Sequence, residues 1–131
     1  MLLEQFALPY REKRSYCLIW TLDGEAIGHC NVNPIVFGVE AFMHLHIWDA
    51  SWRKSGLGIE FLRMTIPHFF ARLELENLYS EPYALNPAPH RALERAGFSF
   101  VKEYETVPGS INFSQRVQRW CFPRTKLPVR V

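Results

Sequence analysis

A short glycine-rich turn is the feature of this sequence that most restricts its fold. The turn reads Arg53-Lys54-Ser55-Gly56-Leu57-Gly58 and follows residues 40–48, where alternating side chains predict a strand. Apolar residues then recur at helical spacing from Ile59 to Leu73. The unpaired N–H groups of a first helical turn attract anions, and glycine lets a ligand approach the backbone closely. The segment predicts either a phosphate-binding turn or, since Gly-x-Gly alone is a weak motif, a plain tight connection.

Turn residues divide the rest of the chain into short elements. Strands are predicted at residues 16–22, 26–33, 77–83, 98–104 and 115–122, and a short helix at 87–96. Asp23-Gly24 predicts a hairpin, Gly97 a helix end, and Pro67 a kink in the longer helix. The sum is an α/β fold with a mixed, mainly antiparallel sheet and flanking helices. It forms one domain over residues 1–131, with an N-terminal arm (1–15) and a C-terminal tail (123–131).

Composition argues against several classes of function. Fifteen Lys and Arg residues against thirteen Asp and Glu leave a formal charge of +2, which argues against a nucleic-acid partner. No run approaches the ~20 apolar residues of a membrane span. No His, Asp and Glu cluster has ligand spacing, so no metal is expected. Three scattered cysteines without CxxC pairs predict reduced thiols in a cytoplasmic protein.

The strand before the glycine turn has two different faces. One carries plain core residues, namely Ala41, Met43, Leu45 and Ile47; the other carries Phe42, His44, His46 and Trp48. An imidazole is a suitable base near neutral pH, so His44 is the first candidate base, and His46 on the same face could relay the proton. The alternative is that both histidines are hydrogen-bonded packing residues.

The order of elements resembles the GNAT superfamily of N-acetyltransferases. The resemblance rests on the turn from Arg53 to Gly58, on Asn86, and on the segment Leu93-Glu94-Arg95-Ala96-Gly97-Phe98, all in register. It covers about residues 16–122 and is nearest to the Rim-type and aminoglycoside 6'-type branches. It implies transfer of an acetyl group from acetyl-coenzyme A to a primary amine of a small molecule or a protein N-terminus.

The same resemblance implies where the cofactor lies. Acetyl-coenzyme A would occupy the gap between splayed fourth and fifth strands, with its pantetheine arm beside Ile47 and Trp48. The residues implied for the pyrophosphate are Arg53, Lys54, Ser55, Gly56, Leu57 and Gly58. Asn86 would contact the same cofactor arm.

The chain departs from the family pattern in two respects. Only about fifteen residues precede Tyr16, so the usual first strand and two helices are expected to be lacking. The family's proton donors fall at Leu93 and Pro89, which cannot donate, and Tyr83 is the possible replacement acid. These departures favour the alternative of a non-catalytic coenzyme A binding or assembly module. They also predict a homodimer, in which a second chain covers the sheet face left open.

Overall fold

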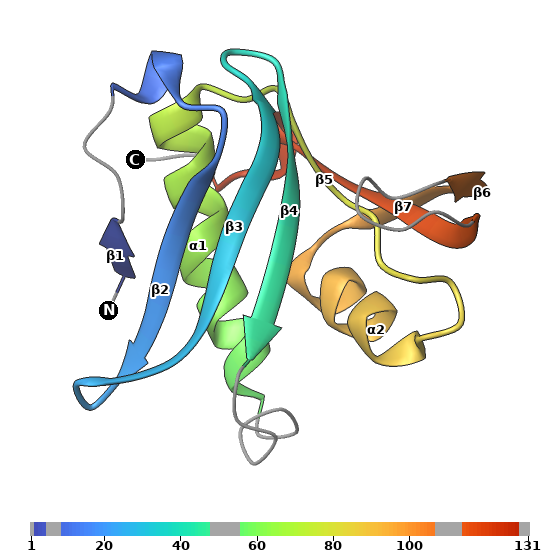
Figure 1. The fold of residues 1–131 in the computed structure, drawn as a ribbon, viewed down its shortest axis with the longest axis horizontal. Helices are drawn as coiled ribbons and strands as arrows, with labels where there is room; N and C mark the ends of the chain where they lie inside the picture. Colours follow the sequence, from blue (N-terminus) through green and yellow to red (C-terminus); the bar gives the residue numbers. More distant parts are fainter. Residues whose placement is uncertain (1, 5–8, 48–55, 107–113, 129–131) are drawn as a thin grey trace.

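The computed structural model describes residues 2–4, 9–47, 56–106 and 114–128, and it consists of one seven-stranded sheet with two α-helices (Figure 1). The strand order is β1-β2-β3-β4-β5-β7-β6, and every pairing is antiparallel except β4 with β5. The predicted fold class is therefore confirmed. The strands are β1 (Leu2–Glu4), β2 (Tyr16–Leu22), β3 (Glu25–Val36), β4 (Glu40–Ile47), β5 (Asn77–Ser80), β6 (Ser99–Thr106) and β7 (Gln115–Pro123). The helices are α1 (Leu57–Leu73) and α2 (Pro87–Ala96), with 3-10 turns at Tyr10–Glu12 and Arg124–Lys126.

The β2–β3 hairpin forms where the sequence predicts it. Asp23 and Gly24 both have positive φ, at 51° and 81°, as a two-residue hairpin turn requires. Strand β3 continues to Val36, three residues beyond its predicted end. Proline normally ends a strand because it donates no hydrogen bond, but here a register shift between Val32 and Ile35 accommodates Pro34.

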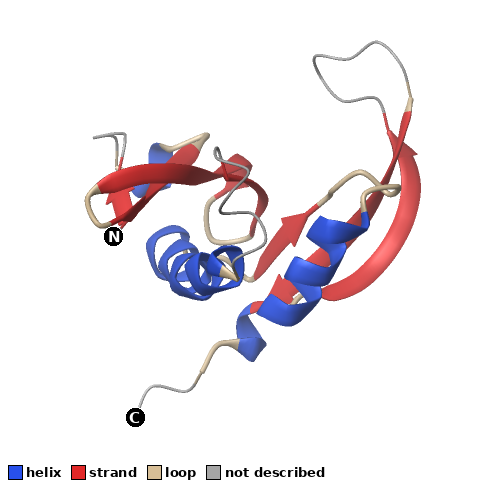
Figure 2. Cartoon of the chain, turned by 90° about the horizontal axis from the view of Figure 1, so that it is seen from below, coloured by secondary structure: helices blue, strands red, loops and turns tan. Residues whose placement is uncertain are grey.

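Helix α1 packs against the concave side of the sheet (Figure 2). Every third or fourth residue of the helix is buried, and the helix runs without a break through Pro67. From β2, the indole of Trp20 stacks on Phe61 at 4.9 Å and donates a hydrogen bond to Thr65 Oγ1 at 3.0 Å. This contact anchors the middle of α1 below the strands.

The N-terminal arm contains a strand that the sequence analysis did not predict. Leu2–Glu4 pairs antiparallel with residues 18–20 of β2, so the expected lack of a first strand is corrected. A three-residue strand is too short to show the alternation by which strands are recognised. Between Pro9 and Tyr16 the arm forms only a 3-10 turn, and Tyr10 packs edge-to-face on Tyr16 at 5.4 Å.

Strand β5 is shorter than predicted and ends at Ser80. Beyond it the chain still follows β7, because Pro82 O accepts from Gln118 N at 3.0 Å and Tyr83 forms an isolated bridge with Val117. No helix of the described residues is long and apolar enough to cross a membrane.

Replacement of Thr65 by Val tests the anchor between α1 and β2. The substitution keeps the shape but removes the acceptor of the Trp20 indole N–H, and both side chains are fully buried. We expect the free energy of unfolding in urea to fall by about 1–3 kcal/mol, the cost of an unsatisfied buried donor. Thr125→Val, on an exposed turn, should change it by less than about 0.5 kcal/mol. An equal loss of unfolding free energy in the two variants would show that the Trp20–Thr65 hydrogen bond does not stabilise the packing of α1.

Candidate functional site

Strands β4 and β5 separate shortly after they meet. They share three residue pairs, from Glu40 opposite Asn77 to Phe42 opposite Tyr79. Ser80 Oγ then donates to the carbonyl oxygen of Met43 at 3.1 Å, and this is the last bond across the junction that the described residues make. Strand β4 continues to Ile47, while the segment that follows β5 turns toward α2. The divergence leaves a wedge-shaped opening at the edge of β4.

A cleft of about 900 Å³ occupies this opening. Its walls are the end of β4 with its neighbour β3, the first turns of α1, and most of α2. The volume lies within the range of small-molecule and cofactor sites. Arg91 and Arg95 line the α2 wall, and none of the described lining residues carries a carboxylate. The cleft is therefore suited to an elongated anion with apolar parts.

The glycine turn forms the mouth of this cleft. Gly56 has φ 84° and directly precedes the first residue of α1, and both Gly56 and Gly58 line the opening. A Cβ on Gly56 would meet no atom within 4 Å, so the space beside its backbone is open to a ligand. Leu57 is half-buried against the core instead. The first helical N–H groups thus lie where an anion could reach them.

Part of the predicted cofactor site falls outside the described residues. This holds for Trp48, Arg53, Lys54 and Ser55. Ile47 is the last residue of β4, and its backbone lies opposite Gly28 of β3. The predictions for these residues stay predictions.

Asn86 lies at the start of α2, on the cleft wall facing β4. It occupies the N-cap position, yet its side chain makes no capping hydrogen bond. Its backbone N–H donates to Tyr83 O at 3.1 Å, which fixes the residue at the helix end. The main chain of Asn86 is therefore held at the helix end, and its exposed side-chain amide lies on the cleft wall.

The cleft brings two histidines together, His46 of β4 and His29 of β3. They are directly paired across the strands, and their rings stack at 4.8 Å. Burial lowers the pKa of His46, and the nearby His29 and His44 lower it further. The lowered pKa of His46 favours its neutral form. His29 was not predicted in the site, although its pairing with His46 follows from the register of the β2–β4 meander.

His44 and Tyr83 lie away from the described lining of the cleft. His44 is exposed, and its Nε2 lies 3.0 Å from the carbonyl oxygen of Asn33. A carbonyl only accepts, so this nitrogen carries the proton and Nδ1 is left as the free acceptor. Tyr83 is 46% exposed. At the two positions where a proton donor was sought in α2, Leu93 is 1% exposed in the core, whereas Pro89 lines the cleft.

An arginine-centred cluster lies just past the point where β4 and β5 meet. The guanidinium of Arg119 lies 5.2 Å from the ring of Phe42 and 5.1 Å from that of Tyr79, and these two rings stack on each other at 5.2 Å. Arg119 Nε donates to Glu81 at 2.7 Å, and Tyr104 OH donates to the same carboxylate. Burial, and then this hydrogen bond, raise the pKa of Tyr104. The cluster fixes both strands at their junction and half-buries Phe42.

The described residues contain no group of three or more His, Cys, Asp or Glu side chains that could hold a metal ion. The site is instead defined by backbone N–H groups, two arginines, an amide and two imidazoles.

A family model described as acetyltransferase (GNAT) domain matches residues 2–99 of the chain. Among solved structures, spermidine N-acetyltransferase SpeG from Vibrio cholerae aligns with a TM-score of 0.75 at 17% identity, covering 88% of this chain and 69% of that one. RimJ of Mycobacterium smegmatis in complex with CoA-disulfide aligns with a TM-score of 0.76 at 17% identity, covering 88% of this chain and 56% of that one. Aminoglycoside acetyltransferase AAC(6')-Ib in complex with coenzyme A aligns with a TM-score of 0.72 at 21% identity, covering 86% of this chain and 68% of that one. At these identities the structural likeness shows the fold alone.

No curated protein matches this sequence.

Proposed function

The chain belongs to the acetyltransferase (GNAT) domain family, and on that premise we propose that it transfers an acetyl group from acetyl-coenzyme A directly to a primary amine. One observation carries the proposal: the cleft between the diverging strands opens onto a glycine turn at a helix start and has cations but no described carboxylate on its walls. The acceptor is a small amine or a protein N-terminus.

The residues of the cleft fit coenzyme A. The backbone N–H groups at Gly56 and Gly58 would hold the pyrophosphate, together with Arg53, Lys54 and Ser55. Past its three pairs with β5, strand β4 presents unpaired backbone groups to the cleft, and these would bind the amide groups of the pantetheine arm near Ile47 and Trp48. Asn86 would bind the same arm from the opposite wall. When bound, acetyl-coenzyme A supplies the thioester that is cleaved.

We assign the base to the histidine pair of the cleft. The attacking amine must lose a proton as its nitrogen bonds to the acetyl carbon, and a neutral imidazole can take that proton. His46 suits this role because it lines the cleft and its lowered pKa favours the neutral form that can accept a proton. His29, stacked on it, would accept part of the developing charge or relay the proton. His44 is the second candidate, through its free Nδ1, and Tyr83 is the candidate acid for the departing thiolate.

A non-catalytic coenzyme A binding module is the alternative, and one observation favours it. Leu93 and Pro89 stand where the family places proton donors, and Leu93 is part of the core. The two functions differ in turnover and not in cofactor binding. Thiol release from acetyl-coenzyme A over a panel of amines and N-terminal peptides separates them.

Replacement of Gly56 by Val tests the phosphate-binding turn. The change forces a β-branched residue to φ 84° and fills the open space beside the backbone of the turn. We expect calorimetric binding of coenzyme A to be lost while the fold is retained. Gly38→Val is a matched control, because Gly38 has φ 78° and equally open surroundings in the β3–β4 turn. Both variants carry a similar strain of about 1–2 kcal/mol. Unchanged affinity in Gly56→Val would contradict the site.

Replacement of His46 by Ala tests the base. We expect turnover to fall by ~10²-fold or more with coenzyme A binding retained, and a smaller loss in His44→Ala. In the wild type, kcat/KM should gain an acidic limb as the pH falls, because protonated His46 cannot accept a proton. Since its pKa is lowered, the midpoint of that limb lies below the ordinary histidine value of 6.5. The limb should vanish in His46→Gln. If His44→Ala lowered turnover more than His46→Ala, His44 would be the base instead.

We also propose a homodimer in which the partner chain covers the sheet face opposite α1. On that face the side chains of β2 to β4 are half-buried or exposed, among them Ile19, Asn31, Phe42 and His44, whereas most of those on the α1 face are buried. A two-fold interface should bury more than roughly 1,000 Å² in total. Sedimentation at micromolar concentration should give twice the chain mass, and a monodisperse monomer would contradict this.

A further inference from the structure

Two buried polar atoms between α2 and the sheet have no hydrogen-bond partner among the described residues. They are Nε2 of His90, on α2, and Nε1 of Trp120, on β7. Trp120 is 7% exposed, and its indole nitrogen is a donor only, so a buried N–H is left unsatisfied. With the His90 proton on Nδ1, Nε2 is an acceptor. Native proteins leave few such groups, because each has lost its bonds to water without a replacement.

The arrangement of the two rings explains why this donor and this acceptor do not meet. The imidazole of His90 is stacked on the indole of Trp120, with 6.1 Å between the ring centroids and 25° between the planes. An indole N–H lies in the plane of its ring, so it points past a ring that is stacked on its face. The bond forms only if the imidazole moves from the face of the indole to its edge. Because Trp120 belongs to the sheet and packs edge-to-face on Phe100 at 5.7 Å, the partner that moves is His90 with α2.

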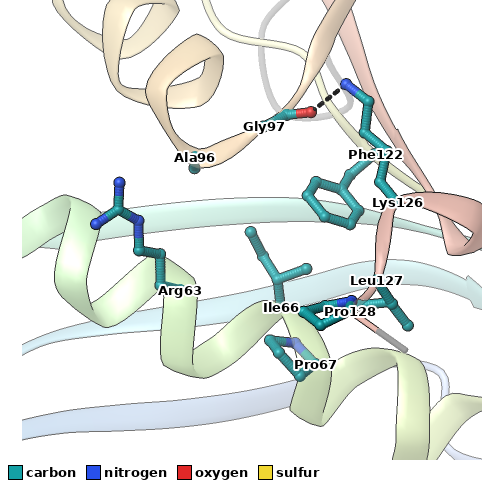
Figure 3. A pocket seen from close by; sticks show the side chains of 9 residues that line it. All are labelled: Arg63, Ile66, Pro67, Ala96, Gly97, Phe122, Lys126, Leu127 and Pro128. Carbon is teal, nitrogen blue, oxygen red and sulfur yellow. Dashed lines mark hydrogen bonds between the residues drawn. The ribbon is translucent and has the colours of Figure 1, made fainter. Parts of the chain in front are cut away.

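Helix α2 is fixed at its C-terminal end and weakly attached elsewhere. Figure 3 shows the fixed end, where Lys126 Nζ donates to Gly97 O at 2.6 Å and a Cβ on Gly97 would lie 2.9 Å from the ring of Phe122. Within the helix, all of whose residues are described, Leu93 is the one buried side chain. At the other end Asn86 makes no side-chain capping bond. A cavity of about 420 Å³ lies between the fixed end and the middle of α1, so the helix has room to rock about Gly97.

The same helix forms one wall of the cofactor cleft. Asn86, Arg91 and Arg95 line that wall, whereas His90 is not among the described lining residues. A ligand that contacts the wall favours the helix position in which its contacts are best. By linkage, the ligand then also stabilises whatever bonds the far side of the helix makes in that position.

We propose that His90 and Trp120 are positioning residues for the cofactor: when coenzyme A occupies the cleft, α2 rocks about Gly97 and Trp120 Nε1–H donates to His90 Nε2. This bond, the latch, fixes the cleft wall in its ligand-bound position and breaks when the cofactor leaves. The inference rests on the proposed function, because coenzyme A is the ligand that shifts the helix. A bridging water would satisfy both nitrogens with or without the cofactor, and so would not couple them to the cleft.

The indole N–H signals in the NMR spectrum of the full chain test the latch directly. The chain has four tryptophans, and the signal lost in Trp120→Phe belongs to Trp120. We expect coenzyme A to move this signal downfield and to slow its exchange with solvent. The same response is expected in His90→Gln, whose amide oxygen can accept the bond, and none in His90→Phe. The Trp20 signal is an internal control, because its N–H already donates to Thr65 Oγ1 at 3.0 Å.

Calorimetry with coenzyme A measures what the latch contributes to binding. Trp120→Phe and His90→Phe should each weaken binding about threefold to tenfold, the range of one neutral hydrogen bond, and the double variant should be no weaker than either single one. His90→Gln should restore most of the affinity. Phe100→Leu is a matched control, since it changes the other ring packed on Trp120 from a residue of β6 instead of α2, and it should leave the affinity unchanged.

Three results would overturn the latch. They are a Trp120 signal that does not respond to coenzyme A, single losses of affinity that add in the double variant, and a coupling of the two substitutions in urea unfolding of the free chain, which a bridging water would produce. The comparison of His90→Phe with His90→Gln decides the question even if Trp120→Phe does not fold. A wild-type chain that binds no coenzyme A refutes the proposed function itself, and the latch with it.

Discussion

The short parallel pairing between β4 and β5 is the constraint on which the site depends. After three residue pairs, the chain of β5 stays with β7, held by Gln118 N to Pro82 O and by the ion pair of Glu81 with Arg119, while β4 continues alone. Beyond these pairs β4 keeps only β3 as its strand neighbour among the described residues. The freed edge of β4 then has backbone donors and acceptors without a strand partner, and a bound ligand with amide groups can satisfy them. The cleft is thus a consequence of sheet topology.

The junction must be stable for the opening beyond it to keep its shape. Arg119 contributes from β7 by lying against rings of both β4 and β5 and by bonding to Glu81. Because the Arg119 and Glu81 side chains are 25% and 19% exposed, solvent screens this pair less than a surface pair. On the other side of the sheet, Ser80 Oγ closes the junction from within the core. Two polar contacts and one aromatic pair therefore hold the point from which the strands diverge.

The sequence predicts the fold well and the site in part, for physical reasons. Alternation and turn residues locate β2, β4, β7 and both helices, because these features are local. Strand β1 was not predicted because three residues are too few to show alternation. Strand β3 is longer than predicted because a register shift accommodates Pro34. Gly56 was predicted from the chemistry of a strand-to-helix turn and Asn86 from the family resemblance; both line the cleft, and their contact with a cofactor stays a prediction. The choice between His44 and His46 cannot be made from alternation, since both lie on one face of β4. It depends on where β5 departs, which is set by β7 some forty residues later in the chain.

The distribution of charge explains why the near-neutral total gives no sign of an anion site. The carboxylates of Glu103 and Glu105 pair with Arg116 on the β6–β7 hairpin, and Glu81 pairs with Arg119. The walls of the cleft, by contrast, carry Arg91 and Arg95 and no described carboxylate. At physiological ionic strength, charges farther apart than about 8 Å are largely screened, so the local balance and not the formal +2 acts on a ligand. Two arginines beside a glycine turn would suit the few phosphates of the small cofactor proposed above. A nucleic acid, with its long row of phosphates, would need a broader basic surface.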